Sequence, residues 1–253
     1  MKSDSFIQFV RECEESYKQF LNISNFPKYE LVSKEITVEK SEKCGFDSWA
    51  TAFYDIPTGK HRLEVWSGIH TFGEDGKYII FHELTHILDD ENIVQRDKIK
   101  YLANHGFTEY HASQIELMQM LGAKNVRQQI TFSMNDSIKT VGGEKSVKEF
   151  VDMPRLLAIE LISRKDFPAD IETMKVTMGL IFNYYGRRSI CKMFAHDYQD
   201  NEDNSIIAKL IYPQTVELLD KFMVSWFDDS KVTFINSLYQ RMLPSLCVKY
   251  NLK

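Results

Sequence analysis

The first twenty residues, MKSDSFIQFVRECEESYKQF, place apolar side chains at a helical period. The apolar positions recur every three or four residues: Phe6, Val10, Cys13, Tyr17 and Phe20. Because that spacing puts them on one side of a helix, we predict an amphipathic N-terminal helix with one buried face. The same stretch has no continuous apolar run of the kind found in a secretory signal peptide.

Between Glu35 and Trp66 the period changes to two. KEITVEK alternates apolar and polar residues, and SWATAFYD and HRLEVWS flank the Pro/Gly turn IPTGK. Alternation of this kind is typical of strands with one buried face, so we predict two strands joined as a hairpin. By analogy with peptide-binding sheets, HRLEVWS is expected to offer an edge to which an extended peptide can pair.

Helical periods return after a loop, HTFGEDGK, in which Asp75 is a possible helix N-cap. One predicted helix contains YIIFHELTHILDD, and a second contains FTEYHASQIELMQMLG and ends at Gly122. QITFSM and SIKTVGG then predict a small β element between Gln129 and Gly143.

Beyond Gly143 the pattern is almost entirely helical, roughly over residues 144–164, 169–198, 205–227 and 231–250. The predicted fold class is therefore α+β. We expect a lobe of residues 1–143 with a small antiparallel sheet, and a helical lobe of residues 144–253 packed against it.

Composition argues against several kinds of partner. The formal net charge is -5 and no basic residues cluster, so we expect neither nucleic acid nor an anionic membrane surface as partner. No apolar run is long enough to cross a bilayer. The four cysteines are scattered and form no CxxC pair, which favours reduced thiols and a cytoplasmic protein. The sequence predicts no oligomeric state.

Three polar side chains in YIIFHELTHILDD share one side of their predicted helix. With His82 at zero on a wheel of about 100° per residue, His86 lies at about 40° and Glu83 at about 100°. The apolar residues lie on the opposite side: Ile80, Phe81, Leu84, Ile87 and Leu88. Histidines four residues apart have Cβ atoms about 5–6 Å apart, so both rings can reach one ion.

This is the HExxH pattern of zinc metallopeptidases. It predicts that His82 and His86 bind Zn²⁺ and that Glu83, on the flank, acts on a water as general base. The alternative is a pair of solvated or internally hydrogen-bonded histidines on a surface helix.

A catalytic zinc normally has three protein ligands and one open position, so a third ligand must come from another element. Glu109 is the first candidate, because it lies on the next predicted helix and Ala112, one turn on, permits close approach. Glu116 is the alternative ligand or a partner that orients a ligand, and His105 and His111 are further alternatives. It also remains open that the Glu109 carboxylate only complements the dipole of a first helical turn.

Asp89 lies on the same helix face as the two histidines. Its distance from His82 along the helix axis, about 10.5 Å, is too great for both to bind one ion. Asp89 is therefore expected to accept a hydrogen bond from a histidine N–H, or to be a solvated acid.

HELTH followed by TEYHASQIE resembles the gluzincin metallopeptidases, and the Glu-x-x-Ala pattern is most similar to the ImmA/IrrE-type peptidases of phages and bacteria. The resemblance covers residues 35–122 and not the helical lobe. It implies a zincin-like lobe in which His82, His86 and Glu109 hold Zn²⁺ and Glu83 transfers the proton of the attacking water to the leaving amine. It also implies a donor to the oxyanion, for which the candidates include Tyr110, His111 and His196.

Two functions follow from the resemblance. The first is an intracellular zinc endopeptidase that hydrolyses a peptide or protein substrate. The second is a catalytically silent, zincin-like protein-binding module whose helical lobe engages a partner. Glu83 favours the first, because an inactive scaffold has no need for a carboxylate between the two histidines.

Overall fold

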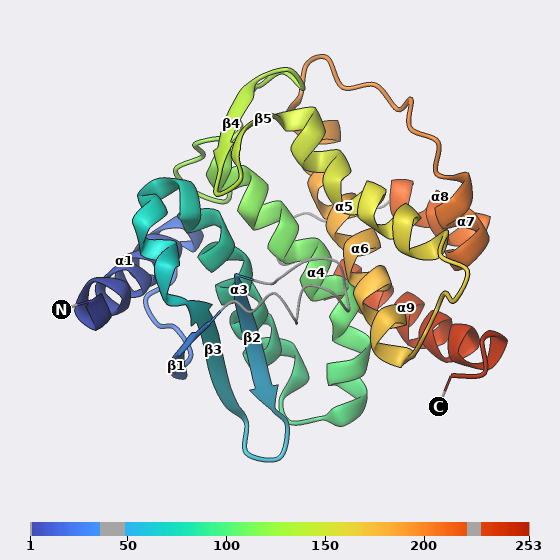
Figure 1. Cartoon of the computed structure of the whole chain (residues 1–253), viewed down its shortest axis with the longest axis horizontal. Helices are drawn as coiled ribbons and strands as arrows, with labels where there is room; N and C mark the ends of the chain where they lie inside the picture. The colour runs from blue at the N-terminus through green and yellow to red at the C-terminus, as the bar shows by residue number, and fades with distance from the viewer. Residues whose placement is uncertain (1, 36–48, 222–228, 253) are drawn as a thin grey trace. The chain divides into compact units, whose positions relative to one another are not determined.

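The computed structural model describes residues 2–35, 49–221 and 229–252 (Figure 1). Most of KEITVEK, with Cys44 beyond it, lies outside these residues. The described elements confirm a mixed α+β fold. The chain divides into two compact units, each built from separate segments. Unit 1 comprises Met1–Tyr101, Ile115–Ile130 and Ile138–Lys145, and unit 2 comprises Leu102–Gln114, Thr131–Ser137 and Ser146–Lys253.

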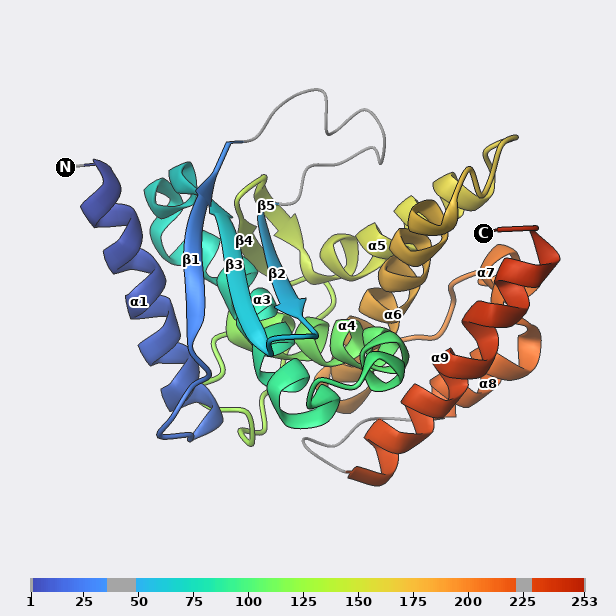
Figure 2. The same ribbon diagram turned by 90° about the horizontal axis from the view of Figure 1, so that it is seen from below.

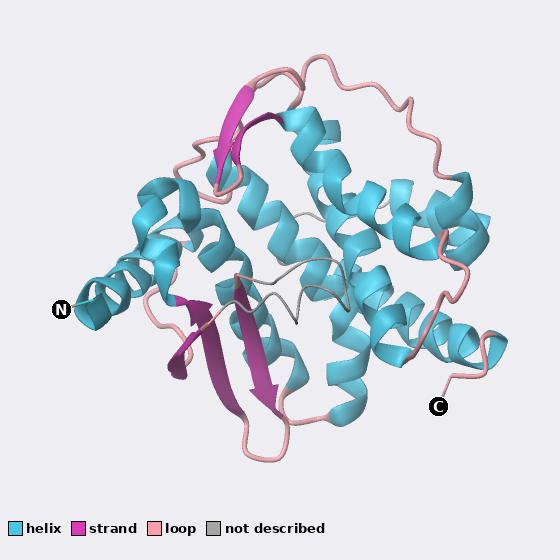
Figure 3. Ribbon diagram, in the orientation of Figure 1, coloured by secondary structure: helices cyan, strands magenta, loops and turns pink. Residues whose placement is uncertain are grey.

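Unit 1 contains a three-stranded sheet, drawn in magenta in Figure 3. Its strands are β1 (Tyr29–Lys34), β2 (Ala50–Asp55) and β3 (Lys60–Trp66), in the order β1-β3-β2. β2 and β3 form the predicted antiparallel hairpin, with Ala52 opposite Leu63. β1 joins β3 in parallel, so the sheet is mixed and not purely antiparallel.

The predicted edge position of HRLEVWS is wrong. That segment is β3, which pairs with a strand on each side, whereas β2 pairs only with β3 in the described part of the sheet. Periodicity reports which face of a strand is buried but not which neighbours it has, and this explains the error.

The predicted N-terminal helix is confirmed as α1 (Lys2–Leu21), and its five apolar positions are buried. α1 packs against α3 (Lys77–Asp89), the helix that contains HELTH, and lies beside β1 (Figure 2). The Tyr17 ring meets the Phe81 ring edge to face at 5.2 Å. Apolar contact therefore fixes the buried side of α3 and leaves its other side for polar groups.

The structure corrects the predicted start of α3. The segment before it is a 3-10 helix, η1 (Ser67–Gly76), with a kink at Gly73, where φ is 53°. Asp75 is not the N-cap, because Gly76 occupies that position and no side chain caps the helix. At its other end α3 continues directly into a π-helical turn, η2 (Asp90–Val94).

The second predicted helix is α4 (Lys98–Met120), which starts well before FTEYHASQ. Asp97 caps it, its carboxylate accepting from the N–H groups of Ile99 and Lys100. Glu109 therefore lies in the middle of α4, and a role in a first helical turn is wrong for it.

The described helices after Ser146 all belong to unit 2. They are α5 (Val147–Ile162), α6 (Ile171–Phe194), α7 (Ser205–Ile211), α8 (Pro213–Lys221) and α9 (Asp229–Lys249). α5 packs along α6, and α7 contacts α5 and α8. The helical segment predicted over residues 205–227 is divided in its described part, because Tyr212 has a φ of 69° and Pro213 begins a new helix.

The small β element predicted between Gln129 and Gly143 is only partly correct. SIKTVGG contains β4 (Ser137–Thr140), which forms a hairpin with β5 (Gly143–Ser146). QITFSM is not a strand, and its Phe132 forms only an isolated bridge with Ala195. The predicted lobe boundary at residue 143 lies in this hairpin, and the last change of unit comes at Ser146. Lobes of residues 1–143 and 144–253 stay a prediction. Within the described ranges, no helix has the length and hydropathy that a membrane crossing requires.

Candidate metal centre

α3 separates its apolar and polar side chains as the helical wheel predicts. Its apolar residues are almost fully buried: Ile80, Phe81, Leu84, Ile87 and Leu88. His82, Glu83 and His86 are each only half-buried. The buried side holds the helix in unit 1, so the three polar groups start from a fixed backbone.

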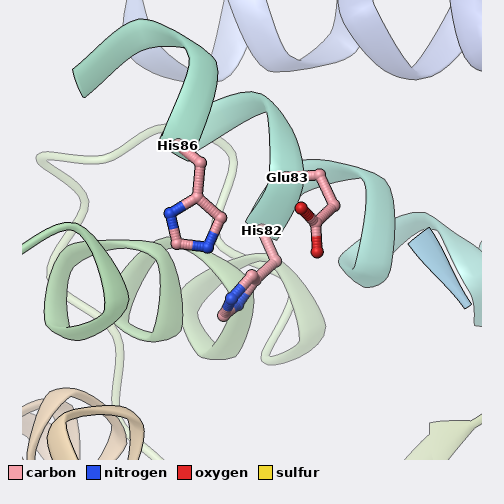
Figure 4. Close-up of side chains that lie close together, drawn as sticks. All are labelled: His82, Glu83 and His86. Atoms are coloured by element: carbon pink, nitrogen blue, oxygen red, sulfur yellow. The ribbon is translucent and has the colours of Figure 1, made fainter. Parts of the chain in front are cut away.

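The two histidine rings extend from the same side of α3, and Glu83 lies on its flank (Figure 4). The ring centroids of His82 and His86 are 4.8 Å apart, and the ring planes meet at 76°. One ligand atom from each of the three residues falls within 4.8 Å of the others. In the described parts of the chain this is the one group of three or more such side chains that satisfies this spacing.

This donor set fits zinc. The two imidazoles are a ligand type that Zn²⁺ binds, and two nitrogens on one zinc at about 2.0–2.1 Å lie about 3.3 Å from each other in tetrahedral geometry. The observed ligand atoms, all within 4.8 Å of one another, are compatible with that separation.

Glu116 of α4 fixes the orientation of the His82 ring. Its Oε2 accepts a hydrogen bond from His82 Nδ1 at 2.7 Å, and the Glu116 side chain is only 4% exposed. An ionised carboxylate can only accept, so Nδ1 carries the proton and Nε2 is the lone-pair nitrogen of a neutral His82. This is the tautomer that a metal bound at Nε2 requires. Of the two predicted alternatives for Glu116, the contact fits the partner that orients a ligand.

The Glu83 carboxylate is anchored to the sheet. Its Oε2 accepts a hydrogen bond from the backbone N–H of Ala52 in β2 at 2.7 Å. No sequence pattern indicates this contact, because a backbone donor 31 residues away carries no side-chain signature.

Asp89 is the last residue of α3 and is 3% exposed, so the solvated-acid alternative for Asp89 is wrong. It lies close enough to Tyr17 for its charge to raise the pKa of that phenol. Burial is the larger cause and holds the pKa of Tyr17 well above its usual value, so the hydroxyl keeps its proton and donates to Thr85 Oγ1 at 2.9 Å. The predicted hydrogen bond from a histidine to Asp89 stays a prediction.

The remaining predicted site residues belong to unit 2. Glu109 is half-buried on α4 and faces Gly179 of α6. Tyr110 and His111 are each 1% exposed, and the His111 ring stacks on Phe107 with centroids 5.4 Å apart.

His105 and His196 complete the unit 2 candidates. The His105 ring lies 5.6 Å from the ring of Tyr239, and His196 is exposed. Ligation by Glu109 or His105, and oxyanion donation by Tyr110, His111 or His196, stay predictions.

Comparisons of this chain with protein-family models, with curated proteins and with solved structures gave no match. The functional assignment therefore rests on the residues and their geometry alone.

Proposed function

We propose that this chain is a zinc-dependent peptidase in which His82 and His86 bind the metal and Glu83 is the general base. The observation that carries the proposal is the group of three ligand atoms within 4.8 Å on one side of α3, with Glu116 hydrogen-bonded to His82 behind it. Two histidines whose only role is structural do not need a buried carboxylate that selects the tautomer of one of them.

When bound, zinc supplies a Lewis acid that polarises a carbonyl oxygen and lowers the pKa of a water toward about 7. The protein's own groups supply the positioning and the proton transfer. His82 and His86 hold the ion, and Glu116 keeps the His82 ring in place. Glu83 takes the proton of the attacking water and delivers it to the leaving amine of the peptide.

The rival function is a silent zincin-like module that binds a protein partner. Glu83 argues against it, since it is half-buried and carries a hydrogen bond that fixes its carboxylate. A group placed in this way is expected to move protons.

Metal content tests the first part of the proposal. After exhaustive dialysis, elemental analysis should find close to one zinc per chain in the wild type and almost none in His86→Ala. His70→Ala is the matched control, because His70 lies outside the group of three and should leave the zinc content unchanged. Wild-type zinc in His86→Ala would contradict the site.

Hydrolysis tests the second part. Glu83→Gln keeps the size of the side chain and an acceptor oxygen but cannot take a proton, so it should retain zinc and lose cleavage of a peptide library by at least about 100-fold. Loss of zinc in Glu83→Gln would instead make Glu83 a ligand. A wild-type protein that binds zinc but cleaves no peptide would support the binding module.

A further inference from the structure

The hydrogen bond between Glu83 and Ala52 joins the two elements on which the proposed chemistry depends. Glu83 extends from α3, and Ala52 lies in β2, an edge strand in the described part of the sheet. α3 and β2 also pack against each other, so the 2.7 Å contact lies within a packed interface of unit 1.

The Ala52 N–H is not part of the β2–β3 ladder. In an antiparallel pair of strands, one residue directs its N–H and C=O groups toward the partner strand, and the next residue directs both groups away from it. Because the Ala52 N–H donates to Glu83, Ala52 and Leu63 form a pair without ladder hydrogen bonds. Thr51 and Phe53, on either side, are then the residues whose N–H groups serve the sheet. Donation to Glu83 therefore costs the sheet nothing.

We propose that the backbone N–H of Ala52 is a positioning group for the general base. It holds Glu83 Oε2 and so fixes the position of the carboxylate that takes and returns the proton. A hydrogen bond to a carboxylate is among the stronger kinds in proteins, and its donor here belongs to a sheet rather than a flexible side chain. The positioning role of Ala52 rests on the proposed function, whereas the hydrogen bond between Ala52 and Glu83 is observed independently of it.

Amide hydrogen exchange tests the contact without zinc or substrate. An outward-facing N–H of an edge strand exchanges quickly unless something accepts its hydrogen bond. The Ala52 amide should be protected in the wild type and in Glu83→Gln, which keeps an acceptor, and should exchange at least about 10-fold faster in Glu83→Ala. The Phe53 amide is the internal control and should stay protected in all three proteins. Equal Ala52 exchange in the wild type and Glu83→Ala would overturn the proposal.

Kinetics test the role. Ala52→Pro removes the N–H at a position where an edge strand tolerates proline, and Ala52→Gly is the matched control that keeps the N–H and removes the methyl group. We expect Ala52→Pro to keep its zinc and its KM while kcat falls about 10–100-fold, as for a misplaced catalytic group. Ala52→Gly should stay close to the wild type. In a Glu83→Gln background the Pro substitution should cause no further loss, because the group that it positions is already absent.

Three results would overturn the positioning role. They are a wild-type kcat with a wild-type KM in Ala52→Pro, a wild-type kcat with a raised KM in the same variant, and an additive loss in the double variant. If Ala52→Pro fails to fold, replacing the amide nitrogen of residue 52 by an ester oxygen removes the same N–H with less change of shape, and the same outcomes apply. If the wild type cleaves no peptide, the proposed function fails, while the exchange result still decides whether Ala52 holds Glu83.

Discussion

His82 is the residue whose surroundings most constrain the chemistry. Its Nδ1 is engaged by a nearly buried carboxylate, so only Nε2 is left to bind a metal. The bond also holds the ring plane in place while His86 approaches from the same side of α3. Removing Glu116 should therefore weaken metal binding without removing a ligand.

Zinc affinity should separate Glu116 from Glu109. Glu116→Ala loses a partner that orients a ligand, which typically costs about 10–100-fold in metal affinity. Glu109→Ala loses a predicted ligand and should lower zinc affinity by a larger factor. Competition with a chromophoric chelator measures both. If Glu116→Ala binds zinc more weakly than Glu109→Ala does, Glu116 is the ligand. If Glu109→Ala keeps the wild-type affinity for zinc, the third ligand is another residue, and His105 and His111 are the next candidates.

The sequence identified the members of the site that follow from local geometry. His82, Glu83 and His86 are within five residues of one another, so the helical period alone brings them together. The contact of Glu116 with His82 spans 34 residues and that of Ala52 with Glu83 spans 31, and both depend on how separate elements pack. Periodicity carries no information about such contacts, which explains why Ala52 was missed and Glu116 remained one of several alternatives.

At the scale of elements, close approach between helices depends on glycine. In unit 2 a Cβ at Gly186 of α6 would lie 2.2 Å from the backbone carbonyl oxygen of Tyr110 in α4. A Cβ at Gly179 of the same helix would meet Glu109 at 3.4 Å, an ordinary contact. Two glycines of one helix therefore have opposite tolerance for a methyl group.

Alanine substitution should show this difference. Gly186→Ala should destabilise the protein by about 2–3 kcal/mol, because the backbone of α4 or α6 must shift to relieve the overlap. Gly179→Ala should be neutral or up to about 1 kcal/mol stabilising, since alanine is the better helix former. Urea unfolding followed by circular dichroism measures both. A Gly186→Ala protein as stable as the wild type would show that α4 and α6 do not approach so closely.

The boundaries of the helices and strands show which parts of the fold could be predicted from the sequence. α1 was predicted because its apolar residues keep one period from end to end, and the β2–β3 hairpin because two strand-like runs flank the Pro/Gly turn IPTGK. The start of α4 was missed because its first residues, KIKYLANH, do not continue the apolar stripe of FTEYHASQ, although Asp97 is a strong N-cap. The break before Pro213 was available from the sequence, since proline disfavours a helical residue before it.

At the scale of the whole molecule, one ion cluster in unit 2 sets an expected response to acid. Asp200 lies between α6 and α7 and contacts Arg188, Lys192 and Tyr198. Partial burial opposes ionisation of Asp200, but hydrogen bonds from Lys192, Arg188 and Tyr198 outweigh it and hold its pKa well below the usual 3.8. A carboxylate with a lowered folded-state pKa stabilises the fold above the unfolded-state pKa, and this contribution is lost as the pH falls toward the folded-state value.

The free energy of unfolding should therefore fall as the pH drops below about 4. Asp200→Asn should be less stable at neutral pH, by on the order of 1 kcal/mol because Asp200 is partly exposed, and its stability should depend less on pH below about 4. Glu160→Gln, which removes an exposed pair with Arg164, is the control and should follow the wild type. Urea unfolding across the acid range decides the matter. A variant with an unchanged acid response would exclude Asp200 as a source of it.

The discontinuous units also bear on how the chain is made. All segments of unit 1 have been synthesised once Lys145 leaves the ribosome, so this unit, with the HExxH helix in it, can complete its own contacts during translation. Unit 2 includes Leu102–Gln114 and Thr131–Ser137, which must wait for partners in Ser146–Lys253. A gene truncated after residue 145 therefore encodes every segment of unit 1, whereas one that begins at residue 146 lacks two segments of unit 2.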